Sequence, residues 1–252
     1  MSCLTKGFII IELVVSRQNT GMTFTDIVNG TGLPKASVHR MLKELLEIGA
    51  LRFDAETSKY RGNLKLASIG SDIVDSFDLR EHVHTFLEQL HIQTGHTCAL
   101  GVKDGDVGVY VDKCEASGYA IKLYSAVGKR FPLYCTALGK LILAQCDTKE
   151  RDRILKLPMK IITAKTVIDP EALRLQMAGV RDQGYALDLE EITRGVICVA
   201  APIFGMHGEN VGAISLAFPS YFNEDRGIQI EIDAVKACAS EISKALEEGK
   251  HA

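Results

Sequence analysis

The stretch GLPKASVHRMLKELLEIGALRFDAETSKYRGNLKL, residues 32–66, decides the fold of the N-terminal part of the chain. Its apolar residues recur at helical spacing from about residue 34 to residue 48. Pro34 suits the first turn of such a helix, and Gly49 suits the position after its end. Residues 50–53 then read as a strand, 54–58 as a turn, and 59 onward as the return strand of a β-hairpin.

Two further helices are expected upstream of this stretch. Residues 4–15 are apolar on most of a helical turn. Thr25 precedes Asp26-Ile27-Val28, and we take it as the N-cap of a short helix that stops near Gly30. Helix, short helix, tight turn and helix make the spacing of a helix-turn-helix, and the hairpin after it makes a wing.

Cations gather on the polar face of the third helix. Lys35, Ser37, His39, Arg40 and Lys43 share it, with no acid before position 44. The wing adds three more cations with no acid between positions 57 and 65: Lys59, Arg61 and Lys65. A DNA major groove admits one α-helix, and such side chains reach base edges or phosphates there. We therefore expect DNA binding by the third helix, with the wing on flanking phosphates.

The distribution of charge along the chain supports DNA binding by the N-terminal part. The 252 residues have a formal charge of −3, yet residues 1–66 hold nine Lys/Arg against six Asp/Glu. A basic head on an acidic body suggests that the head alone meets a polyanion. Seven scattered cysteines without a C-x-x-C pair argue against a disulfide framework or zinc knuckle and for the cytoplasm. No apolar run is long enough to span a membrane.

The rest of the chain predicts an α+β domain built on an antiparallel sheet flanked by helices. A helical pattern over 67–95, broken near residue 77, begins with a linker helix. We divide the chain into residues 1–66, the linker 67–80 and a C-terminal domain over 81–252. Its expected strands are 98–102, 107–111, 119–125, 185–187, 196–204 and 211–218. Its expected helices are 136–145, 151–157, 170–184 and about 223–248.

Four segments in this order resemble the IclR family of bacterial transcription regulators. They are LPKASVHRMLKELLEIGAL, SKYRGNLKLASIG, AVGKRFPLYCTALGKLILA and GYALDLEEITRGVICVAAPIF. The resemblance covers nearly the whole chain. It implies a winged helix-turn-helix, a linker helix and a GAF-like effector domain. It also implies binding to a pseudo-palindromic double-stranded DNA operator as a homodimer or dimer of dimers, as a repressor or activator of catabolic genes, in the cytoplasm.

The resemblance also implies site residues. The recognition helix would be 35–47, and the expected DNA contacts are Thr25, Lys35, Ala36, Ser37, His39, Arg40, Lys43, Lys59 and Arg61. The effector would be a small organic acid, and two segments are similar to the branch that senses sugar acids such as 2-keto-3-deoxygluconate. Its pocket maps to Ala137, Leu138, Asp188, Cys198 and Ser215. The family's second serine is Ala217 here, and its small residue at 138 is leucine.

A physical interpretation of the same residues stands beside the resemblance, and the resemblance is what favours it. Thr136 would cap the helix that begins at Ala137, and the free N–H groups of the first turn attract a carboxylate. Asp188, Cys198 and Ser215 would then meet hydroxyl or keto groups. The alternative is that Asp188 is a surface acid and Cys198 a small, buried hydrophobic residue without a role in binding.

Other functions have weaker support. Gly139-Lys140 lacks the rest of a P-loop, so no nucleotide site is expected. Cys135 or Cys198 with a histidine would make a nucleophile, and His82, His84 and His91 would make a metal site, but no local signature supports either. We expect no catalytic residue, cofactor or metal. The alternative that stays open is a small-molecule enzyme or sensor whose winged helix contacts protein.

Overall fold

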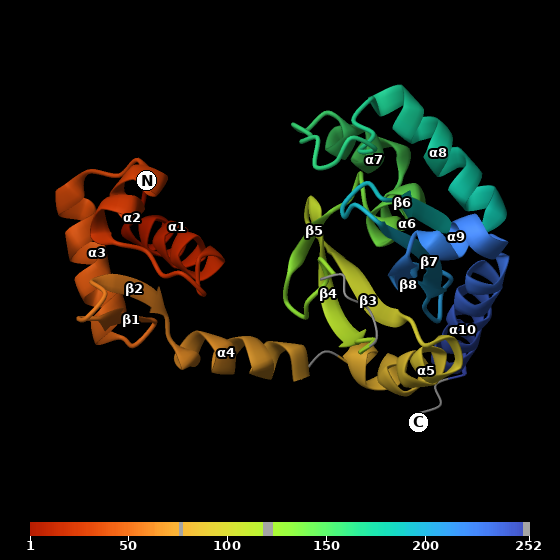
Figure 1. Ribbon diagram of the computed structural model, residues 1–252, viewed down its shortest axis with the longest axis horizontal. Coiled ribbons are helices and arrows are strands. Elements are labelled where there is room, and N and C mark those ends of the chain that lie inside the picture. The colour runs from red at the N-terminus through yellow and green to blue at the C-terminus, as the bar shows by residue number, and fades with distance from the viewer. Residues whose placement is uncertain (76–77, 118–122, 249–252) are drawn as a thin grey trace. The chain divides into compact units, whose positions relative to one another are not determined.

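The computed structural model describes residues 1–75, 78–117 and 123–248 (Figure 1). The chain divides into two compact units, Met1–Ser76 and Phe77–Ala252. Each unit has its own buried apolar cluster. Within the described residues, no helix combines the length and the apolar character that crossing a bilayer requires.

The first unit is a winged helix. Helices α1 (Cys3–Ser16), α2 (Phe24–Thr31) and α3 (Lys35–Glu47) precede the hairpin of β1 (Leu51–Asp54) and β2 (Lys59–Gly62), and α4 (Leu64–Asp75) follows. Gly49 ends α3 at φ +73°, which turns the chain so that the N–H of Ala50 reaches Leu45 O at 2.9 Å. The left-handed conformation is cheap only for a residue without Cβ, which explains the glycine. The predicted helix-turn-helix and wing are confirmed.

The short helix α2 corrects one detail of the sequence analysis. Its N-cap is Thr23, whose hydroxyl accepts the N–H of Asp26, while the Asp26 carboxylate accepts the N–H of Thr23. This reciprocal pair is a capping box. Thr25 therefore lies inside the helix on its exposed side, and its prediction as the cap was wrong.

The second unit is an α+β domain around one antiparallel six-stranded sheet of order β5-β4-β3-β8-β7-β6. The strands are β3 (Thr97–Asp104), β4 (Val107–Cys114), β5 (Arg130–Pro132), β6 (Ala186–Leu189), β7 (Val196–Phe204) and β8 (Asn210–Pro219). The helices are α5 (Asp78–Thr94), α6 (Ala137–Gln145), α7 (Thr148–Leu155), α8 (Pro170–Gln183), α9 (Tyr221–Arg226) and α10 (Gln229–Glu247). The predicted antiparallel sheet flanked by helices is confirmed.

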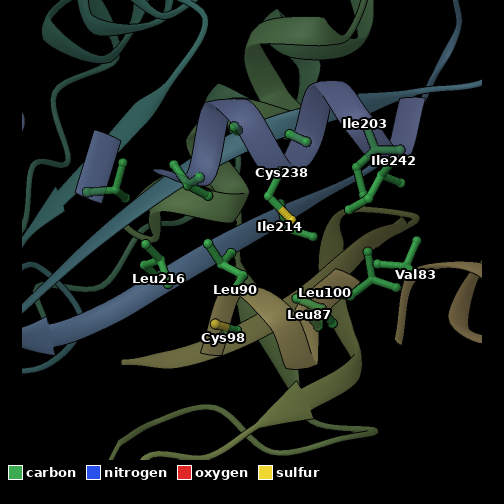
Figure 2. Packing of buried hydrophobic residues seen from close by; sticks show 14 of the residues in the cluster. Val83, Leu87, Leu90, Cys98, Leu100, Ile203, Ile214, Leu216, Cys238 and Ile242 are labelled. Carbon is green, nitrogen blue, oxygen red and sulfur yellow. The ribbon is translucent and has the colours of Figure 1, made fainter. Parts of the chain in front are cut away.

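Alternation along the strands creates two different sheet faces. One face, with residues such as Leu100, Ile214 and Leu216, packs against α5 and α10 (Figure 2). The opposite face, with Ala99, Ala200 and Ala213, packs against α6 and helices beyond it. The first face carries large, branched side chains. On the second face, the central strands β3, β7 and β8 carry small side chains. A small cavity lies beside the second face.

The prediction and the structure differ at three elements. Residues 119–122 of the expected strand 119–125 lie outside the described residues, and Leu123–Ser125 are not in a strand. The three-residue strand β5 was not predicted. The expected helix 223–248 is two helices, because Gly227 at φ +73° and ψ 179° has a non-helical backbone and separates α9 from α10.

Candidate DNA-binding face and ligand site

Helix α3 separates an apolar face from a polar face. Val38, Met41, Leu42 and Leu45 are buried in the core of the winged helix. The face turned to solvent carries Lys35, Ala36, His39, Arg40 and Lys43, and Ser37 is half-buried at its edge. The structure thus brings six of the nine predicted DNA contacts together on one helix face.

The exposed cations of α3 are only loosely paired. Arg40 Nε lies 4.0 Å from Glu44 Oε1, and Lys43 Nζ lies 3.9 Å from Glu47 Oε1, one helical turn away. Such exposed i,i+4 pairs contribute about 0.3–0.5 kcal/mol. A phosphate or a base edge therefore competes with them at little cost.

The wing cations are held more firmly than the sequence suggested. Arg61 Nη1 lies 3.2 Å from Asp54 Oδ2 across the hairpin, with only 19% of the Arg61 side chain exposed. Lys59 Nζ donates to Thr20 O at 2.8 Å. The premise that no acid neighbours these cations was wrong for Arg61, because hairpin pairing places Asp54 beside it. Arg52 on β1 is exposed and was missed, although strand alternation after the buried Leu51 marks it.

On the sheet face of small side chains, the strand register places the predicted ligand residues in two neighbouring rows. Asp188 pairs with Cys198, and Cys198 pairs with Ala217. Ser215 lies one step along, paired with Ala200 on one side and Ala99 on the other. These three strands therefore carry the predicted side chains as direct neighbours.

A small cavity lies against these rows. Its volume is about 30 Å³, and Cys198 and Ser215 belong to its lining, as do Thr97, Ala99, Tyr110, Leu123, Tyr124, Ser125, Ile192, Thr193, Val196 and Ala217. That space holds a water molecule but not a metabolite. Ala137, Leu138 and Asp188 are buried outside this lining.

The N-terminus of α6 is arranged as predicted. Thr136 Oγ1 accepts the N–H of Gly139 at 3.0 Å, which caps the helix. In the part of the chain that the structure describes, no hydrogen bond engages the N–H groups of Ala137 and Leu138. Both residues are buried, so these two donors and the helix dipole favour an anion.

Asp188 is buried with half of its carboxylate unused. Its Oδ1 accepts the N–H of Glu191 at 2.6 Å, whereas its Oδ2 has no hydrogen-bond partner. Burial raises the pKa of this carboxyl to about 7, although the Glu191 N–H lowers it in part. Desolvation disfavours the charged form of an acid, which is why the pKa rises.

A buried ion pair beside Asp188 was missed by the sequence analysis. Lys140 on α6 donates to Glu191 Oε1 and, at 3.2 Å, to Gln176 Oε1 on α8. The side chains of Lys140 and Glu191 are 4% and 5% exposed. The signal in the sequence was a lysine inside the apolar run LGKLILA, since a lysine is rarely buried without a partner.

The histidines and cysteines considered as alternatives have other roles. His84 Nδ1 lies 2.7 Å from Asp112 Oδ2, and His91 Nδ1 lies 2.7 Å from the carbonyl oxygen of His96. Among the described residues no group of three or more metal-ligating side chains occurs. Burial raises the pKa of Cys135 to about 12 and that of Cys198 well above its usual value, so both stay protonated thiols.

Comparison with known proteins assigns the family. The model of the bacterial transcriptional regulator IclR C-terminal domain matches residues 71–244, and the IclR helix-turn-helix domain matches residues 4–55. The chain belongs to the IclR family. This family consists of bacterial transcriptional regulators, so the winged helix belongs to a DNA-binding regulator.

Relatives agree over the length of both units. The HTH-type transcriptional regulator XynR of Escherichia coli is 37% identical over 203 residues, 80% of this chain and 80% of that protein. KdgR of the same organism is 32% identical over 248 residues, 98% of this chain and 93% of its own. The crystal structure of Thermotoga maritima IclR is 31% identical, with a TM-score of 0.73 over 97% of this chain and 98% of that chain.

Proposed function

We propose that this IclR-family regulator changes its affinity for DNA when a small carboxylic acid binds between the N-terminus of α6 and strands β6–β8. The unused Oδ2 of Asp188 carries the proposal, because buried polar oxygens are normally hydrogen-bonded. The uncapped N–H groups of Ala137 and Leu138 offer donors for the ligand carboxylate. Cys198 and Ser215 then face its hydroxyl or keto oxygens from the cavity side.

A sugar acid is the effector that we favour. The similarity to KdgR covers 98% of this chain, in line with the resemblance of two segments to the sugar-acid branch. The cavity lining adds hydroxyl groups among its apolar side chains, those of Thr97, Tyr110, Tyr124, Ser125, Thr193 and Ser215. Alternating donors and acceptors of this kind suit a polyhydroxy chain.

For a metabolite to enter, the cavity must enlarge. Tyr124 and Ser125 line it and belong to an exposed loop, where Lys113 Nζ donates to Ser125 O at 2.9 Å and Tyr124 Oη donates to Arg130 O at 3.1 Å. Backbone hydrogen bonds fix the far end of this loop, because the Gly128 N–H donates to Tyr110 O at 2.7 Å and the Tyr110 N–H donates to Lys129 O at 3.0 Å. Movement of residues 123–126, which mainly side-chain contacts hold, therefore admits the ligand.

The thiols near the site do not support nucleophilic catalysis. With both thiols protonated, neither Cys135 nor Cys198 is a nucleophile at neutral pH. A ligand that only binds regulates through a difference in affinity between two arrangements of the protein. We assign no catalytic residue, and we place the protein in the cytoplasm with its DNA.

The same proposal includes a dimer formed by the winged helix. A groove of about 440 Å³ lies in this unit between α1, α3 and α4, and it is almost entirely apolar. Leu4, Phe8, Ile48 and Ile69 line it with 51–72% of each residue exposed. A second copy is the expected occupant, because two-fold related recognition helices read pseudo-palindromic half-sites.

Thermal-shift and calorimetric titration of the full chain test the ligand site. 2-Keto-3-deoxygluconate, pyruvate and the neutral polyol sorbitol serve as probes. We expect the acids to bind and sorbitol to fail, since sorbitol leaves the helix donors unpaired. Ser215→Ala should weaken acid binding about tenfold, the worth of one hydrogen bond, while the exposed Ser68→Ala changes nothing. Equal binding by the parent and Ser215→Ala would place the ligand elsewhere.

A further inference from the structure

The ligand site contains more negative than positive charge. Asp188, Glu191 and Lys140 are 1%, 4% and 3% exposed, so bulk water does not screen their charges. Lys140 donates to both Glu191 Oε1 and Gln176 Oε1. Within the part of the chain that the structure describes, Lys140 is the cation of this cluster and is already paired with Glu191, and no salt bridge joins it to Asp188.

Two oxygens of the cluster lack hydrogen-bond donors. They are Asp188 Oδ2 and Glu191 Oε2, both fully inaccessible to solvent. Three other ionisable groups feel the charge of Asp188: Tyr110 on β4, Cys135 before α6 and Cys198 on β7. Burial raises the pKa of each, so all three stay neutral at neutral pH. With Asp188 ionised, the cluster has a net charge of −1.

A ligand carboxylate would bring a second uncompensated negative charge into this buried space. Among the described residues, the unused N–H groups at the start of α6 are the partners that it gains, and like charges at close range strongly disfavour double ionisation. One proton removes the conflict, because a neutral Asp188 presents an O–H donor where Oδ2 now lacks a partner. The carboxyl then donates to the ligand and no longer repels it.

We propose that the site takes singly charged carboxylic acids and binds each one together with a proton that Asp188 retains. This inference rests on the proposed function, since it concerns the same site. It excludes dicarboxylates as effectors, because one proton neutralises only one of the two added charges. It also makes effector affinity fall with rising pH once Asp188 is ionised in the ligand-free protein.

The acidity of Asp188 agrees with this role. Its pKa of about 7 leaves a mixture of both forms at neutral pH, so the proton is available where the regulator works. The bound anion raises that pKa further, since a nearby negative charge favours the protonated acid. The expected uptake is close to one proton per acid at pH 8.5 and a small fraction of a proton at pH 6.

A first experiment needs no ligand. The unfolding equilibrium of the full chain is measured by urea from pH 5 to pH 8.5 for the parent, Asp188→Asn and the exposed Asp182→Asn. A folded pKa raised above the unfolded value near 4 means that the folded state holds the proton longer, so stability falls as pH rises towards 7. The unfolding constant of the parent relative to Asp188→Asn should rise about tenfold per pH unit up to pH 7 and then level off. A flat ratio would overturn the proposal.

A second experiment counts protons with the ligand. Binding of 2-keto-3-deoxygluconate and pyruvate is followed by calorimetry at pH 6 and pH 8.5, in two buffers of different ionisation enthalpy. Asp188→Asn keeps an N–H donor in place of the O–H, so it should bind these acids without proton uptake. Asp182→Asn should behave as the parent does. Succinate should bind at least tenfold more weakly than pyruvate.

The outcomes separate the two proposals. Acid binding by the parent at pH 8.5 with no proton uptake, or with the same uptake in Asp188→Asn, contradicts the proton-coupled site and leaves the proposed function intact. No binding of either acid at pH 6, where Asp188 is protonated, contradicts both. Uptake of about one proton that disappears in Asp188→Asn establishes the inference.

Discussion

At the scale of single residues, Lys140 is the side chain on which the ligand domain most depends electrostatically. Replacing it by Ala leaves Glu191 buried without its cation, and breaking a buried pair from one side costs about 3–5 kcal/mol. Lys103→Ala is the matched control. It removes a pair with Glu150 whose side chains are 31% and 28% exposed, and it should cost about 0–1 kcal/mol. Urea denaturation that gives equal losses for both variants would contradict this account of the cluster.

Individual site residues could be predicted only where local pattern or family resemblance marked them. Cys198 and Ser215 line the cavity as expected, and Thr136 caps α6. The Lys140–Glu191 pair joins residues 51 positions apart, so the apolar run around Lys140 signals that the lysine needs a partner but does not identify Glu191. Asp188 was foreseen as a hydrogen-bond acceptor, but its burial depends on how β6 joins the sheet.

At the scale of elements, two helix glycines should respond in opposite ways to alanine. A Cβ on Gly139 in α6 would lie 2.5 Å from Leu133 Cα and 2.6 Å from Pro132 O, which are backbone atoms with little freedom to move. Gly139→Ala should therefore destabilise the protein by about 1–3 kcal/mol. Gly179 in α8 has open space around its Cβ position, so Gly179→Ala should stabilise by about 0.5–1 kcal/mol. Thermal unfolding of both variants checks the pair, and destabilisation by Gly179→Ala would refute the argument.

The recognition helix and the wing should differ in how they read DNA. Arg40 is exposed on α3 and only loosely paired, so Arg40→Ala should cost about 1–3 kcal/mol and relax sequence preference if it contacts a base. Lys59→Ala should weaken binding to all duplexes alike and lower the salt slope by about one. Fluorescence anisotropy on operator and scrambled duplexes measures both effects. Unchanged affinity in the double variant would show that another surface binds DNA.

Strong periodicity and capping made most elements predictable, and weak or interrupted signals explain the rest. Helix α8 runs from the cap Asp169 to the left-handed Gly184 as expected. Strand β5 has only three residues and forms because β4 offers a free edge, which is a tertiary cause. In the closing helix the apolar spacing continues through Gly227, but the glycine backbone turns there and ends α9.

At the scale of the whole molecule, the exposed apolar groove of the winged helix predicts self-association. Phe8 lines this groove with 58% of the residue exposed, so Phe8→Glu should place a charge in the dimer contact and give monomers. Ile230 on α10 is 65% exposed and lies outside the groove, and Ile230→Glu should keep the parent's state. Sedimentation velocity at micromolar concentration distinguishes the two. A monomeric parent, with and without DNA, would contradict the dimer.

The central claim is that an acid bound by the C-terminal domain changes the affinity of the winged helix for DNA. The most direct test is one titration of the full chain onto duplex DNA from its own upstream region, by fluorescence anisotropy at pH 6.5, with and without 2-keto-3-deoxygluconate. The account predicts that the acid shifts the parent's Kd for this DNA by at least about fivefold, the lower end of typical allosteric coupling. In the variant with Asp188→Ala and Ser215→Ala, the ligand-free Kd should stay unchanged and the shift should vanish. A Kd that the acid leaves unaltered in the parent, or shifts equally in that variant, would contradict it.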